Sequence, residues 1–99
     1  MEIKIQSIRF DADKQLLEQI RTKVEKLQKF DASLAEAQVY LKLDAELGGF
    51  HEKVVEIKLT KPGNTYFSKA ERGTFEDGLD EVLEALEVQV KKQRDKEKS

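Results

Sequence analysis

The sequence predicts an α+β fold in which a four-stranded sheet carries both helices on one face. Segments of alternating apolar and polar residues predict strands, and longer segments with apolar residues three and four positions apart predict helices. The segments follow in the order β-α-β-β-β-α. Because each strand has one apolar face and each helix one apolar stripe, a two-layer sandwich buries all of them in a single core.

The first element is a strand over residues 2–8. Ile3 and Ile5 alternate with polar neighbours, which is the pattern of a half-buried strand. Ile8 and Phe10 break this alternation. The break indicates a bend or bulge where the chain leaves the strand.

A helix is predicted over residues 13–29, with Asp11 or Asp13 as its cap. Its apolar stripe consists of Leu16, Leu17, Ile20, Val24 and Leu27. The polar side is mostly basic, and lysines recur at every third residue along one flank of the stripe. This basic row is Lys23, Lys26 and Lys29.

Three further strands are predicted over residues 35–44, 52–60 and 65–71. The first of them has the strictest alternation in the chain. Gly48-Gly49 marks the turn that follows it, where a positive φ is expected. Short turns join these strands, so we expect an antiparallel meander.

The last element is a long helix over residues 74–98. Thr74 is its expected cap, with Asp77 three residues further on. Acidic residues crowd the first half and basic residues the second, and both suit the helix dipole. Its apolar stripe consists of Phe75, Leu79, Val82, Leu83, Leu86 and Val90.

Composition limits the function classes. The chain has 99 residues, which we expect to form one domain over residues 1–99, with residues 93–99 as a frayed tail. The formal net charge of −2 is unlike that of a uniformly basic nucleic-acid binder, so any anion binding must be local. Without cysteine, a signal-peptide profile or a long apolar segment, we expect a cytoplasmic protein.

Residues for catalysis are sparse, and we do not expect an enzyme, a metal site or a cofactor. His51 is the only histidine, and we interpret it as a solvated loop residue. No serine has an identifiable base in the pattern, and no cysteine is present as a nucleophile or metal ligand. The carboxylates of the last helix are interpreted as a solvated acidic face near a helix start.

Two basic segments predict binding to an anion. One is the row at Lys23, Lys26 and Lys29, and the other is a cluster near the C-terminus that includes Lys91, Lys92, Arg94 and Lys96. If the two helices lie side by side on the sheet, these segments flank a groove suited to the phosphates of structured RNA. The alternative is that both are ordinary charged helix surfaces, since lysines near a helix C-terminus also serve the dipole.

The order of elements and several segments resemble the ribosome hibernation-promoting factor / ribosome-associated inhibitor family, also called the sigma-54 modulation or S30EA-type family. The resemblance runs through nearly the whole chain and rests on order and spacing rather than on one motif. Its segments are MEIKIQ (1–6), KVEKL (23–27) with FD (30–31), AQVYLKL (37–43), VVEIKL (54–59), FEDGLD (75–80) and LEVQVKK (86–92).

The resemblance implies a short-form member with a fold like a double-stranded-RNA-binding domain. It implies a non-catalytic protein that occupies the decoding region of the small ribosomal subunit and blocks mRNA and tRNA there. Lys23, Lys26 and Lys92 match basic positions of the family, with Lys29 and Arg94 as neighbours. The chain departs from the family pattern where Ala85 and Val88 replace a lysine and an arginine, and where Glu76 replaces an aromatic residue.

We therefore carry two hypotheses forward. The first is a ribosome-binding translation inhibitor that grips the small subunit and its rRNA with Lys23, Lys26, Lys29, Lys91, Lys92 and Arg94. The second is a diverged module of the same fold that binds a protein, or weakly associates with itself, through Val88 and the acidic half of the last helix.

Overall fold

The computed structural model describes residues 1–45 and 51–98 of the chain, so the predicted Gly48-Gly49 turn lies outside the described residues. The elements confirm the predicted order β-α-β-β-β-α, with a short 3₁₀ helix, η1, following the first α-helix. They are β1 (Glu2–Ile8), α1 (Lys14–Glu25), η1 (Lys26–Lys29), β2 (Glu36–Ala45), β3 (His51–Lys61), β4 (Asn64–Arg72) and α2 (Phe75–Glu97).

The four strands form one sheet in the order β1-β2-β3-β4. β1 pairs with β2 in parallel, and the other pairs are antiparallel, which confirms the predicted meander. Gly63 in the β3–β4 turn has a φ of 82°, a value that glycine adopts without strain. Ile5, Val39 and Ile57 lie side by side in the register, so they share one face of the sheet.

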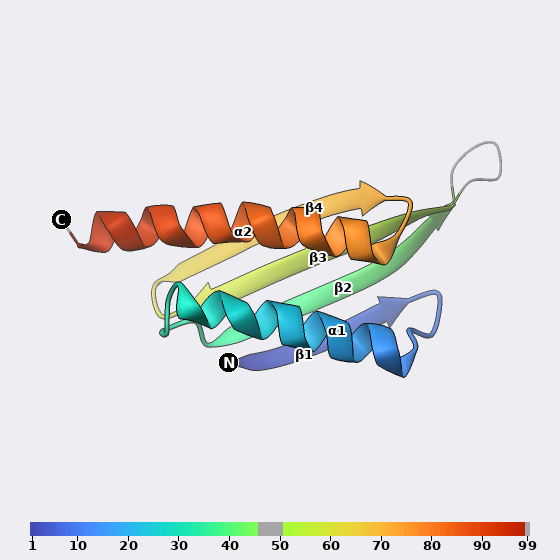
Figure 1. Cartoon of the computed structure of the whole chain (residues 1–99), viewed down its shortest axis with the longest axis horizontal. Coiled ribbons are helices and arrows are strands. Elements are labelled where there is room, and N and C mark those ends of the chain that lie inside the picture. The colour runs from blue at the N-terminus through green and yellow to red at the C-terminus, as the bar shows by residue number, and fades with distance from the viewer. Residues whose placement is uncertain (46–50, 99) are drawn as a thin grey trace.

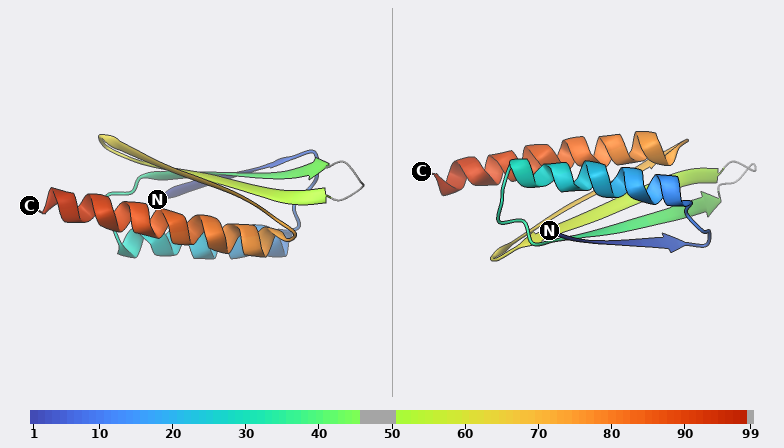
Figure 2. Two further views of the ribbon diagram at one scale, coloured as in Figure 1. Left: turned by 90° about the horizontal axis from the view of Figure 1, so that it is seen from above. Right: turned by 60° about the horizontal axis from the view of Figure 1, so that its bottom comes forward.

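Both helices cover the same face of the sheet, as predicted (Figure 2). α1 lies over β1 and β2, whereas α2 lies over β3 and β4 (Figure 1). The colours of Figure 1 show that the two helices run in the same direction, opposite to β1, β2 and β4. Their N-terminal ends therefore lie at one end of the molecule and their C-terminal ends at the other.

One continuous core lies between the sheet and the helices. The helices contribute Ile20, Val24, Leu27, Leu79, Val82, Leu86 and Val90. The strands contribute Ile3, Ala37, Val39, Leu41, Val55, Ile57, Leu59, Tyr66 and Ala70. These are the apolar positions that the two periodicities of 2 and 3.6 residues select in strands and helices.

The first helix begins as predicted and ends differently. Asp13 Oδ1 accepts a hydrogen bond from the Leu16 backbone N–H at 2.7 Å, so Asp13 is the cap. Arg9, with a φ of 70°, marks the bend before it. The predicted single helix over 13–29 is wrong in its last turn, where the chain tightens into η1 and the Phe30 N–H bonds to the Leu27 carbonyl at 3.0 Å.

α2 extends to Glu97, into the stretch expected to fray. Thr74 Oγ1 accepts a hydrogen bond from the Asp77 N–H at 3.1 Å, as the sequence predicts. At the other end, Arg94 and Glu97 contact distant parts of the chain, namely Phe30 and Lys61. Such contacts oppose fraying because they offset part of the entropy that the chain gains when a helix end unwinds.

Each helix donates one side-chain hydrogen bond to a backbone carbonyl of an edge strand. Arg21 Nη1 donates to the Ile3 carbonyl of β1 at 3.1 Å, and Gln89 Nε2 donates to the Phe67 carbonyl of β4 at 3.0 Å. Unpaired carbonyls on edge strands otherwise attract strands of other molecules. The two helices therefore protect the sheet they cover.

We predict that Gly78→Val lowers the free energy of unfolding by about 2 kcal/mol because it overpacks the helix–sheet contact. A Cβ at Gly78 would lie 3.0 Å from Val55 Cγ2, and the valine side chain of β3 has little freedom to move away. Urea unfolding measures the change. Ala85→Val in the same helix is the matched control and should cost only about 0.5 kcal/mol of helix propensity; equal losses in the two variants would contradict the prediction.

Candidate functional site

The basic row predicted for the first helix lines a groove between the two helices. The groove has a volume of about 270 Å³. Its walls are Lys23, Lys26, Leu27, Lys29 and Phe30 from α1, η1 and the residue after them, and Leu83, Glu84 and Glu87 from α2. The structure thus places all three lysines of the row beside the second helix.

The change from α1 to η1 contributes to this arrangement. A 3₁₀ helix has three residues per turn, so side chains three positions apart lie in line along its axis. Lys26 and Lys29 occupy such positions at the two ends of η1. The tightened last turn therefore keeps them in one row beside the groove.

Phe30 joins the two basic segments. Lys29 Nζ lies 5.0 Å and Lys91 Nζ 4.7 Å from the centroid of its ring, distances at which a cation is attracted to an aromatic face. The Phe30 carbonyl accepts a hydrogen bond from Arg94 Nη1 at 2.9 Å. These contacts bring Lys91 and Arg94, which were predicted site residues, to the end of the basic row. The role of Phe30 was missed in the sequence analysis, although an aromatic residue directly after a row of lysines is a visible signal.

Lys92 does not lie with Lys91 and Arg94 beside Phe30. Gln89, three residues earlier, bonds to β4, and Glu81 pairs with Arg72 of β4, so this flank of α2 faces the sheet edge and not α1. Residues three and four apart lie on the same side of a helix, which places Lys92 on the β4 flank. The predicted C-terminal cluster is therefore divided between two sides of α2.

Carboxylates of α2 share the groove with the lysines. Asp80 Oδ1 lies 2.9 Å from Lys23 Nζ, across the two helices, and Glu87 Oε2 lies 2.9 Å from Lys91 Nζ within α2. Glu84 also lines the groove. Asp80 and Glu84 are exposed to solvent, as interpreted from the sequence, and the carboxylates of Glu84 and Glu87 also give the groove a mixed charge.

A second charge cluster lies beyond the end of the groove, around Lys61. Lys61 Nζ lies 2.7 Å from Asp31 Oδ2 and 2.8 Å from Glu97 Oε1. The side chains of Lys61 and Asp31 are only 7% and 10% exposed. The hydrogen bond from Lys61 lowers the pKa of Asp31 to about 2, and bonds to Asp31 and Glu97 raise the pKa of Lys61. This cluster ties the end of α2 to the β3–β4 turn and to the residue after Phe30.

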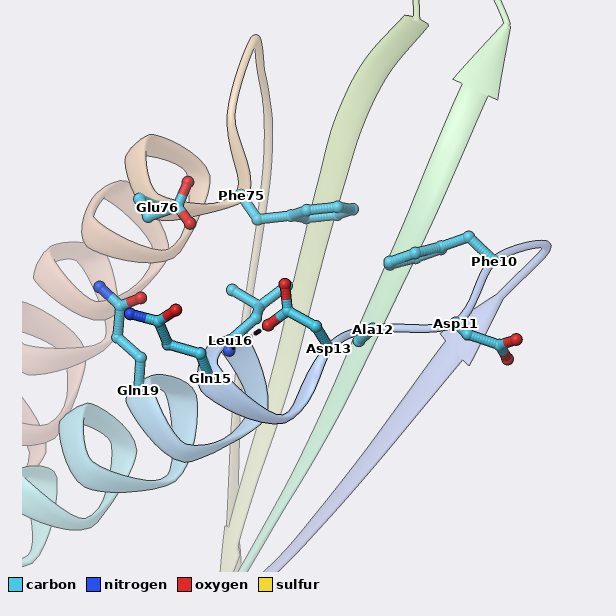
Figure 3. Close-up of a pocket in the computed structure, with 9 residues that line it drawn as sticks. All are labelled: Phe10, Asp11, Ala12, Asp13, Gln15, Leu16, Gln19, Phe75 and Glu76. Carbon is cyan, nitrogen blue, oxygen red and sulfur yellow. Dashed lines mark hydrogen bonds between the residues drawn. The ribbon is translucent and has the colours of Figure 1, made fainter.

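A hollow of about 450 Å³ lies near the N-terminal ends of the two helices, and Figure 3 shows the side chains that line it. Phe10 and Phe75 stack above it with their centroids 5.0 Å apart and their planes within 11°. Asp11, Asp13 and Glu76 give it acidic walls. Acidic walls repel phosphate, so this hollow is not a candidate site for an anion.

Residues 1–45 and 51–98 offer little evidence for a metal site or a membrane-spanning helix. No cluster of three or more His, Cys, Asp or Glu side chains there could hold a metal ion. No helix in those ranges is both long and apolar enough to cross a membrane. His51 is the first residue of β3 and not a loop residue as interpreted from the sequence, and its side chain lies outside the described part of the structure.

Comparison with known proteins finds a family that matches this chain. Residues 3–98 match the family described as sigma 54 modulation protein / S30EA ribosomal protein. A search of curated proteins finds no match. The family description names no catalysed reaction, in keeping with the prediction of a protein that is not an enzyme.

Two solved structures resemble this chain in fold. A ribosomal subunit interface protein from Coxiella burnetii superimposes with a TM-score of 0.83 at 21% identity, covering 95% of this chain and 98% of that one. The N-terminal domain of Thermus thermophilus Protein Y superimposes with a TM-score of 0.81 at 22% identity, covering 93% of this chain and 98% of that one. Both confirm the α+β fold.

We predict that the Lys61 cluster makes stability depend on acid. The pKa of Asp31 is lowered from 3.8 to about 2 on folding, so the ionised form stabilises the fold above pH 3.8 and this contribution is lost as the pH falls towards 2. Thermal unfolding at about pH 6 should find Asp31→Asn less stable than the parent chain.

The difference between the two proteins should shrink as the pH approaches 2, because the parent then loses the same charge. Glu18→Gln, an exposed carboxylate of α1, is the matched control and should follow the parent chain at every pH. A gap between Asp31→Asn and the parent that stays constant down to pH 2 would refute the assignment.

Proposed function

Because this chain belongs to the sigma 54 modulation protein / S30EA ribosomal protein family, we propose that it binds the ribosome and inhibits translation. In this proposal it is a cytoplasmic hibernation factor that occupies the decoding region of the small subunit and excludes mRNA and tRNA. It acts by occupying space and by pairing with rRNA phosphates, without catalysis or a cofactor. The observation that carries the proposal is the family match over residues 3–98.

The neighbouring structures support the same partner. One of the solved structures described above is that of a ribosomal subunit interface protein. A protein at that interface meets a surface dominated by RNA, whose phosphates are recognised by lysine and arginine and by shape. The groove between α1, η1 and α2 offers such cations on a rigid frame.

The groove lysines differ in availability. Lys26 is exposed, and within the described part of the chain it forms no ion pair. Lys29 lies over the Phe30 ring and forms no ion pair within residues 1–45 and 51–98, while Lys23 and Lys91 are held by carboxylates. We therefore assign the strongest phosphate contacts to Lys26 and Lys29, with Lys23, Lys91 and Arg94 beside them and Lys92 on the far flank of α2 as an outlying contact.

The overall charge requires this local site. With a net charge of −2, the chain as a whole is not attracted to RNA. Binding must come from a few phosphate contacts, each of which releases counterions and makes the affinity fall as salt rises. A strong salt dependence is thus part of the proposal.

We predict that Lys23→Glu combined with Lys26→Glu weakens co-sedimentation with purified small ribosomal subunits at least about tenfold at low salt, because attraction to phosphate is replaced by repulsion. The salt series should show a shallower slope for the variant, by about 0.7–0.9 for each phosphate that the variant no longer neutralises. Sedimentation across the salt series measures both quantities.

The matched control is Lys4→Glu combined with Lys58→Glu. It changes the net charge equally, but both positions are exposed on the sheet face away from the helices. The control should bind nearly as well as the parent chain. Absence of binding by the parent at low salt, or an equally weakened control, would sink the proposal.

A second candidate function has its own observation. Val88 on α2 is 60% exposed and Phe67 on β4 is 53% exposed, the large apolar side chains most open to solvent in the described part. The alternative proposal is a diverged module that binds a protein or weakly associates with itself through Val88 and the acidic half of α2. Phe67 pairs with Lys58 on the sheet face away from the helices, so Val88 on α2 is the apolar side chain that the alternative depends on.

For this alternative we expect the mean mass in solution to rise with concentration and Val88→Glu to abolish the rise, because a charge cannot be buried there without a partner. Light scattering over a concentration series measures the mass. Thr22→Glu, on an exposed face of α1, is the control and should leave the rise intact. A constant monomer mass in the parent chain would exclude self-association.

A further inference from the structure

Lys23, which lines the groove, and Lys91, which lies beside Phe30 at its end, are already engaged within the molecule. Lys23 Nζ lies 2.9 Å from Asp80 Oδ1, and Lys91 Nζ lies 2.9 Å from Glu87 Oε2. Glu84 lines the same groove and adds a third negative charge. The ammonium groups that would meet a phosphate are therefore paired in the unbound protein.

An external anion can take the place of the carboxylate in each of these ion pairs. The Asp80 side chain is 62% exposed, and Glu87 and Lys91 are also far from buried. Exposed ion pairs stabilise a fold only slightly, so a phosphate can replace the carboxylate without unfolding anything. A carboxylate left behind in the groove still repels the incoming phosphate.

We propose that Asp80 and Glu87 limit the affinity of the groove, because their carboxylates compete with the phosphates of a bound polyanion for Lys23 and Lys91. The inference rests on the proposed function and adds two residues that act against it. Only a ligand that presents phosphates at both lysines at once replaces both carboxylates. The competition thus disfavours irregular, sparsely charged RNA and keeps binding reversible.

The alternative role for these residues is structural. Lys23 and Asp80 join α1 to α2 across 57 positions of sequence, and such a pair could serve to hold the helices together. The two roles predict opposite results when the carboxylates are neutralised. A structural pair, once broken, loosens the groove and weakens binding, whereas a competitor, once removed, strengthens it.

The test compares the parent chain with Asp80→Asn plus Glu87→Gln. The matched control is Glu18→Gln plus Glu25→Gln, which changes the net charge by the same amount on exposed positions of α1 that do not line the groove. Binding to purified small ribosomal subunits and to long-chain inorganic polyphosphate is measured over a salt series. Thermal unfolding of all three proteins reports whether the fold is retained.

We expect the groove variant to bind both probes about tenfold or more tightly than the control. Its salt slope should be steeper by about 0.7–0.9 for each lysine released, because each then displaces counterions when it meets phosphate. An affinity no higher than that of the control, for a variant that remains folded, overturns the inference. Unfolding of the groove variant at a much lower temperature than the control also overturns it, since it would assign the pairs a structural role.

The two probes separate this inference from the proposed function. If the parent chain binds polyphosphate but not ribosomal subunits, the proposed function fails and the polyphosphate series alone decides the role of the carboxylates. If the parent chain and the groove variant bind neither probe, the inference fails as well. Tighter binding of the variant to both probes supports the proposed function and the inference.

Discussion

Burial of the apolar stripe of α2 against β3 and β4 is the interaction on which the rest of the structure depends. Leu79, Val82, Leu86 and Val90 are completely or almost completely buried, and each such side chain contributes about 1.5–3 kcal/mol relative to exposure. The close approach at Gly78 brings the start of the helix onto the sheet. Burial of the stripe sets the rotation of α2 about its own axis. That rotation determines which of its two charged flanks faces α1.

The shared direction of the two helices then distributes charge along the molecule (Figure 1). Each helix starts near acidic residues and ends with basic ones, as the helix dipole favours. Parallel helices therefore collect carboxylates around the hollow at one end and lysines around Phe30 at the other. Lysines thereby gather at one end of a protein whose net charge is −2, next to the carboxylates of Glu87, Asp31 and Glu97.

The candidate site was predictable in part. Lys23, Lys26 and Lys29 share a flank because of local periodicity, and the structure confirms that they lie together beside α2. The C-terminal cluster looked like one unit along the chain, yet Lys91 and Arg94 reach Phe30 while Lys92 lies on the other flank. Consecutive residues on a helix point about 100° apart, so closeness in sequence says little about shared direction.

The sequence by itself determined the type and order of the elements and the start of each α-helix, whereas the end of the first helix differed from the prediction. Alternation and helical periodicity define the strands and helices, and Asp13 and Thr74 act as caps through bonds to residues three positions away. Only the tertiary structure decided the charge of the groove, because Lys23 and Asp80 are separated by 57 positions and meet solely where two packed helices pass each other. Local patterns arise from neighbours along the chain, whereas such pairs arise from the burial of apolar faces, which specifies where the charged flanks come to rest.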